Sequence, residues 1–229
     1  MSTPDQDRAI VLSRLRVALG VADADADGVR EAAVADRLKR HPRGTIPARA
    51  LLSPEAGIAL LEGMLAGQGA EMTRASTPMA AVRAIADTLR AHELPIVLRM
   101  GIDPVLEALP WKAAPVLERR FSAAESEDRA ALSRAVAAAS ETGTLFLVSG
   151  ADNPTTLAFL PETHIILIRA SDIVGCYEEA FDRLRAAFGA ATLPRSVTMI
   201  SGPSRTADIE QTIVRGAHGP KRLHVVVLG

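Results

Sequence analysis

The chain has 229 residues, a formal net charge of −1 from 26 basic and 27 acidic residues, and a single cysteine, Cys176. The balanced charge, with no long basic run and no aromatic cluster, argues against a nucleic-acid partner. One cysteine excludes an internal disulfide and any four-cysteine zinc or iron–sulfur site, so we expect no metal and no cofactor in this chain.

Helices are expected first along the chain. Apolar residues recur among charged ones over residues 4–19, and a second helix is predicted over 29–39. The two prolines and the glycine of residues 41–47 break this pattern. We therefore place an N-terminal helical arm at residues 1–53 and an α/β domain at residues 54–229.

Helices and apolar strands alternate in the predicted domain. Helices are predicted over residues 54–67, 78–90, 125–140 and 172–188, and strands near residues 71, 95, 144, 164, 197 and 223. Uninterrupted apolar strands suit a parallel sheet that is covered on both faces. The residues include no signal-peptide core and no run of about 18 apolar residues, which predicts a cytoplasmic protein without a transmembrane segment.

The last 34 residues, from position 196 to the C-terminus, contain the densest polar pattern of the chain. They read as a strand, a loop that begins at Gly202 and Pro203, a helix that runs to about Arg215, a turn, and the strand LHVVVL. A loop that enters a helix N-terminus can hold an anion, because free N–H groups and the helix dipole face it. The alternative is that Ser204 and Thr206 only cap the helix.

Four segments resemble one known family. SGPSRTADIE and GAHGPKRLHVVVL, preceded by ETGTLFLVSG and LPETHIILI, are similar to sequences of the LUD-domain family, the lactate-utilisation protein C proteins. The resemblance covers residues 94–229 closely. It implies a three-layer α/β/α fold with a mostly parallel sheet, like that of the sugar-phosphate isomerase and CoA-transferase superfamily. It also implies a role in a multi-protein system that oxidises L-lactate to pyruvate.

The candidate site residues come from spacing and from this resemblance. The loops after the strands at 144 and 197 are predicted to meet at the carboxyl edge of the sheet, where α/β proteins bind ligands. The ligand-binding candidates of the second loop are Ser201, Gly202, Pro203, Ser204, Arg205, Thr206 and Asp208. Spacing does not bring the remaining candidates to that edge, and the resemblance adds Gly143, Thr144, Glu162, His164, His218, Gly219 and His224.

The catalytic residues are not identified by the sequence, and three positions are the best candidates for acid–base chemistry. His218 lies in a glycine-bounded turn and is the best acid or base candidate, and Asp208 and Glu141 are the other catalytic candidates. His164 and His224 each begin a buried strand, where a structural histidine is the alternative.

Two functions are compatible with these residues. The first is a component of a lactate-oxidising complex that binds a small anion or organises iron–sulfur partner proteins without carrying the redox centre. The second is a free-standing CoA-transferase-like or isomerase-like enzyme that acts on a phosphorylated or CoA-linked small molecule. A G-x-S-x-G elbow is missing, and neither Glu141 nor Glu162 has the glycine-rich context of a CoA-transferase glutamate, so a binding role is favoured.

Overall fold

The computed structural model describes residues 4–20, 24–189, 192, 194–209, 212–216 and 218–229. Contacts between Cα atoms divide the chain into two compact units, Met1–Thr45 and Ile46–Gly229. The first unit contains α1 (Pro4–Ala18) and α2 (Ala24–Arg40), where the sequence predicts helices. In the described part of the chain, no helix is long and apolar enough to span a membrane.

The second unit begins before the predicted boundary at residue 54. Its first element, the 3₁₀-helix η1 (Ala48–Ala50), ends at the buried Ala50. The Ala50 carbonyl lies so close to Gly175 that a Cβ built on the glycine would meet the Ala50 oxygen at 2.1 Å. This close backbone approach joins η1 to the rest of the unit.

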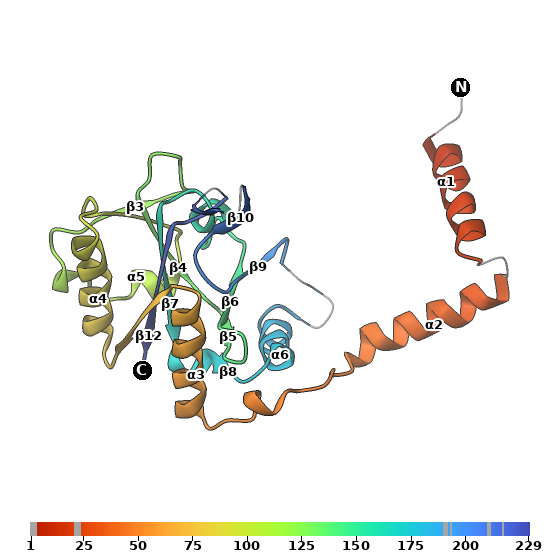
Figure 1. Cartoon of the computed structure of the whole chain (residues 1–229), viewed down its shortest axis with the longest axis horizontal. Helices are drawn as coiled ribbons and strands as arrows, with labels where there is room; N and C mark the ends of the chain where they lie inside the picture. Colours follow the sequence, from red (N-terminus) through yellow and green to blue (C-terminus); the bar gives the residue numbers. More distant parts are fainter. Residues whose placement is uncertain (1–3, 21–23, 190–191, 193, 210–211, 217) are drawn as a thin grey trace. The chain divides into compact units, whose positions relative to one another are not determined.

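A six-stranded sheet forms the centre of the second unit (Figure 1), and all its neighbouring strands are parallel. The strand order is β1–β12–β7–β4–β2–β3. The strands are β1 (Glu71–Ala75), β2 (Val97–Met100), β3 (Glu118–Phe121), β4 (Ala130–Arg134), β7 (Thr163–Arg169) and β12 (Arg222–Leu228). The central β7 and β12 are buried on both faces, as their apolar runs predict, and the parallel α/β fold class is confirmed.

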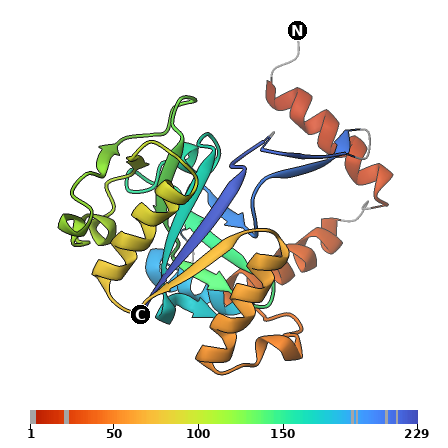
Figure 2. The same ribbon diagram turned by 60° about the vertical axis from the view of Figure 1, so that its left-hand side comes forward.

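Different elements cover the two faces of this sheet (Figure 2). On one face, Val82, Ile85 and Leu89 of α4 (Pro78–Ala91) belong to one buried cluster with side chains of β4, β7 and β12. The other face is covered by α3 (Pro54–Gly67) and a second sheet. That four-stranded sheet has the order β8 (Ile173–Val174), β5 (Ala137–Ala139), β6 (Thr144–Val148) and β9 (Val197–Ile200), and α6 (Tyr177–Phe188) packs on its outer side.

Short elements complete the unit. They are α5 (Pro104–Glu107), η2 (Trp111–Ala113), η3 (Thr155–Ala158), η4 (Ala170–Asp172) and the antiparallel strands β10 (Arg205–Ile209) and β11 (Thr212–Arg215). The connection over residues 150–161 contains η3 and leads from β6 in the second sheet to β7 in the first. It is therefore neither a crossover within one sheet nor a hairpin, the two forms that its length allows.

Two predicted helices are wrong. Residues 125–140 contain β4 and β5 rather than a helix, because the alanines of both strands are buried on both faces of their sheets. Residues 204–215 carry β10 and β11, whose β-branched residues favour strands. Gly143, with φ +70°, turns the chain between β5 and β6.

Candidate functional site

The loop after β9 lies at the amino edge of the central sheet, not at its carboxyl edge. Strand β9 runs antiparallel to β6, so that Val197 pairs with Val148 and Ile200 pairs with Leu145. The end of β9 therefore lies beside the start of β6. The loops that follow β6 and β9 occupy opposite ends of this ladder, and the prediction that they meet over one pocket is wrong.

Backbone hydrogen bonds hold the loop after β9 to the turn before β12. The Ser204 N–H donates to the Pro220 carbonyl over 2.8 Å, and the Gly216 N–H donates to the Ser204 carbonyl over 3.1 Å. Since residues 205–209 are a strand, the predicted anion site at a helix N-terminus does not exist. The capping role predicted for Ser204 is wrong for the same reason, and the side chains of Thr206 and Asp208 lie outside the described residues.

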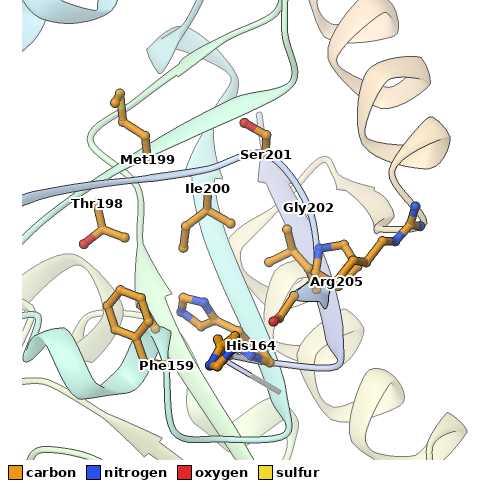
Figure 3. A pocket seen from close by; sticks show the side chains of 15 residues that line it. Phe159, His164, Thr198, Met199, Ile200, Ser201, Gly202 and Arg205 are labelled. Carbon is orange, nitrogen blue, oxygen red and sulfur yellow. The ribbon is translucent and has the colours of Figure 1, made fainter. Parts of the chain in front are cut away.

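A cavity of about 280 Å³ lies between these two segments (Figure 3). His164 and Leu223, near the amino ends of β7 and β12, contribute to its wall. The predicted site residues that line the cavity are His164, Ser201, Gly202, Pro203, Ser204, Arg205, His218 and Gly219. Apolar side chains that sequence reasoning missed, including Phe159, Met199 and Ile200, complete it, and its volume suits a small molecule.

His164 is the most buried polar side chain of this wall, with 1% of its surface exposed. Its Nε2 lies 3.0 Å from Ser133 Oγ on β4, whereas Nδ1 has no hydrogen-bond partner among the described residues. Burial lowers the pKa of His164 from 6.5 to about 3, so the ring is neutral at neutral pH. The sequence did not indicate Ser133 as a site residue, because it lies in the segment that was predicted as a helix.

Ser201 joins the cavity to a cluster of hydroxyl groups. Thr144 Oγ1 lies 2.7 Å from Ser201 Oγ and 2.8 Å from both Thr142 Oγ1 and Tyr177 Oη. Thr144 is fully buried, and its oxygen is the centre of this cluster. The Glu141–Thr144 turn therefore lies next to Ser201, although strand spacing alone does not place it there. Glu141 itself accepts a hydrogen bond from the Tyr177 N–H over 3.0 Å, at the start of α6.

A second, polar cavity of about 520 Å³ shares Phe159, His218 and Gly219 with the first. Arg129, Glu162 and Lys221 contribute its charged side chains, together with Asp128. Glu162 Oε1 accepts from Arg222 Nη1 over 2.9 Å, and its other oxygen pairs with Arg129. Glu162 thus lines the second cavity, which adjoins the first, and pairs with two arginines.

The structure places His224 on the opposite face of the sheet from the cavity. Its Nε2 lies 2.9 Å from Thr73 Oγ1, and its Nδ1 lies 3.2 Å from Thr88 Oγ1. Burial lowers the pKa of His224, and the neighbouring Glu71 carboxylate, 3.3 Å from Nδ1, partly opposes this effect. Gly143 is not among the residues that line the cavity either, and a Cβ there would meet Met64 of α3 at 2.8 Å.

Comparisons with known proteins agree with this architecture. The family model of the LUD domain matches residues 58–228. The chain is 39% identical over 101 residues to lactate utilization protein C of Deinococcus radiodurans, covering 44% of this chain and 46% of that protein. It is 35% identical over 89 residues to lactate utilization protein C of Bacillus subtilis, covering 38% of this chain and 37% of that protein.

A solved structure is similar over a larger share of the chain. The crystal structure of a DUF162 family protein from Deinococcus radiodurans matches with a TM-score of 0.57 and 26% identity, covering 78% of this chain and 99% of that chain. The sequence alignments with the two lactate utilization proteins, in contrast, span less than half of each relative's length.

Proposed function

Because the chain belongs to the LUD domain family, we propose that it takes part in lactate utilisation as a ligand-binding component of a multi-protein system that oxidises L-lactate to pyruvate. The names of its relatives from several bacteria support the pathway. The cavity at the amino ends of β7 and β12 is the observation that supports a binding role. It combines a volume for a small molecule with a buried histidine nitrogen that has no partner among the described residues.

In the proposed system, other proteins carry out the electron transfer. A single cysteine cannot ligate a conventional iron–sulfur cluster, so we assign the clusters to partner proteins of the system. The proposed ligand of this chain is a small organic acid anion. Lys221 in the adjoining cavity supports this choice, because a cation attracts a carboxylate, whereas Arg129 in the same cavity is already paired with Glu162.

An add-back experiment tests the proposal. L-lactate-dependent reduction of a dye acceptor is measured in an extract of the source organism that lacks this chain, with and without the purified protein. We expect the purified protein to restore reduction in the extract and to reduce no dye by itself. Reduction at the full rate without the protein, or by the protein alone, contradicts the proposed role.

A further inference from the structure

The hydrogen bond between Ser133 and His164 determines which nitrogen of the buried ring carries the proton. Among the described residues, His164 Nε2 is the partner of the Ser133 hydroxyl, and Ser133 is itself only 1% exposed. A buried O–H donor needs an acceptor, so the hydroxyl donates and Nε2 accepts. In a neutral imidazole the proton is then on Nδ1, which becomes an N–H donor without an acceptor among the described residues.

The one arginine that the structure describes in the wall around this donor is hydrogen-bonded to another part of the chain. Arg205 is the one arginine or lysine among the described lining residues. Its guanidinium donates to the carbonyl of Gln68 at the end of α3, and Figure 3 shows its side chain extending toward that helix. The ring of His164 is neutral, and the apolar side chains of Phe159 and Ile200 line the same cavity. A carboxylate is poorly stabilised in such surroundings, whereas an uncharged oxygen needs only the N–H donor.

We propose that His164 recognises the ligand through a hydrogen bond from Nδ1–H to an uncharged oxygen, the carbonyl of a 2-oxo acid or the hydroxyl of a 2-hydroxy acid. This inference rests on the proposed function, because it takes the ligand to be a small organic acid. It also specifies the orientation of the ligand. The oxygen on C2 points inward to His164, and the carboxylate points outward to the side where Lys221 lines the adjoining cavity. A simple carboxylic acid lacks the inward contact.

Three acids of similar size test this orientation by isothermal titration calorimetry of the full chain. Pyruvate and L-lactate carry an oxygen on C2, and propionate does not. We expect pyruvate or lactate to bind about tenfold more tightly than propionate, the difference that one hydrogen bond in a buried site supplies. Equal affinity for all three acids, or no binding of any, overturns the inference.

Two substitutions of His164 distinguish the roles of its two ring nitrogens in ligand binding. The Asn side chain places an amide near the position of Nδ1, and the Gln side chain reaches the position of Nε2 beside Ser133. His164→Asn is therefore expected to keep much of the preference for pyruvate over propionate, and His164→Gln is expected to lose it. Thr73→Val, which removes a hydroxyl on the opposite face of the sheet, is the control that leaves the preference unchanged. The same preference in His164→Gln as in the wild type overturns the inference.

A measurement on the wild-type protein does not depend on how the variants fold. Long-range ¹H–¹⁵N correlation spectra report which nitrogen of each histidine ring is protonated. We expect His164 to show a neutral ring with the proton on Nδ1, and the Nδ1–H signal to shift when pyruvate is added. A proton on Nε2, or an unchanged Nδ1 signal at saturating pyruvate, overturns the inference.

The failure of this inference is distinguishable from the failure of the proposed function. If pyruvate binds at His164 but the protein has no effect on lactate-dependent dye reduction, the proposed role in lactate utilisation is wrong and the recognition by His164 stands. If dye reduction depends on the protein but propionate binds as well as pyruvate, the role stands and the recognition by His164 is wrong.

Discussion

Two buried histidines lie side by side in the central sheet and differ in what surrounds them. Leu223 pairs with His164 and His224 pairs with Ile165, so the two rings are one register position apart and face opposite sides of the sheet. The Thr88 hydroxyl donates to the Ala84 carbonyl and so accepts from His224 Nδ1–H. Thr73 Oγ1 is the hydrogen-bond partner of His224 Nε2. Among the described residues, His224 therefore has partners for both nitrogens, and His164 has a partner for one.

This difference separates a histidine of the core from one that has a nitrogen left for a ligand. The sequence treats the two alike, because each begins a buried apolar strand. The neighbours that distinguish them, Thr73 and Thr88 on one face and Ser133 on the other, come from β1, α4 and β4.

The largest effect is expected for the histidine with two partners. His224→Ala removes a ring that is only 9% exposed and leaves a hole next to Thr73 and Thr88. We expect the free energy of unfolding to fall by about 3 kcal/mol, as for other buried rings. Urea unfolding measures this decrease, and pyruvate affinity should not change. A decrease in affinity at unchanged stability would reverse the roles assigned to the two histidines.

The second prediction concerns stability in acid. The pKa of native His164, about 3, lies below its usual value of 6.5, so only the unfolded state takes up a proton as the pH falls through 6.5. The folded protein therefore loses stability on the acid side. Of the loss between about pH 7.5 and about pH 5, His164 contributes about 2 kcal/mol. Urea titrations should show a loss smaller by this amount in His164→Gln, and parallel curves for both proteins would contradict the buried neutral ring.

The hydroxyl cluster on the cavity side is expected to matter less. Thr144→Val keeps the shape of the side chain and removes the oxygen shared by Ser201, Thr142 and Tyr177. Those three partners are partly exposed and can bond to water, so we expect the unfolding free energy to fall by about 1 kcal/mol. Thr142→Val is the matched control, because it removes only the hydrogen bond between Thr142 and Thr144. If the unfolding free energy fell as much as in His224→Ala, the hydroxyl cluster would be packed as tightly as the core around His224.

The smallest effect is expected at the exposed Arg205. Arg205→Met keeps the apolar stem and removes the hydrogen bond to the Gln68 carbonyl. Exposed interactions of this kind contribute about 0.5 kcal/mol, which corresponds to a decrease in Tm of about 1 to 2 °C. Pyruvate affinity is expected to stay the same, because the guanidinium is directed at α3. A marked decrease in affinity in Arg205→Met would show that the arginine, rather than His164, holds the ligand.

The sequence predicted most of the fold from local patterns. The helices α3, α4 and α6 and the strands β1, β2, β6, β7, β9 and β12 lie where periodicity, caps and apolar runs place them. The failures have a common physical cause. Alanine at 137–139 suits a helix by propensity, but burial on both faces of the second sheet, against the central sheet and against α6, favours a strand. In the same way, nothing local in residues 197–200 specifies that this strand pairs antiparallel to β6.

The sequence predicted several residues of the candidate site but not how they come together. Ser201–Arg205, His164 and His218–Gly219 were named as candidates, and the structure brings them to one cavity. Their meeting depends on the direction of β9, which moves its loop from the carboxyl to the amino edge of the sheet. The same direction places Thr144 beside Ser201. Strand direction is set by long-range pairing, so spacing along the chain could not reveal it.

The position of β12 has a consequence for how the protein is made. This strand lies between β1 and β7, and its His224 pairs with Glu71 of β1, far earlier in the chain. During synthesis, the facing edges of β1 and β7 have no partner until residues 222–228 leave the ribosome, and such non-local pairing is slow. The binding cavity, whose wall includes Leu223 of β12, therefore forms late, and apolar strand edges are open to aggregation or to chaperones until then.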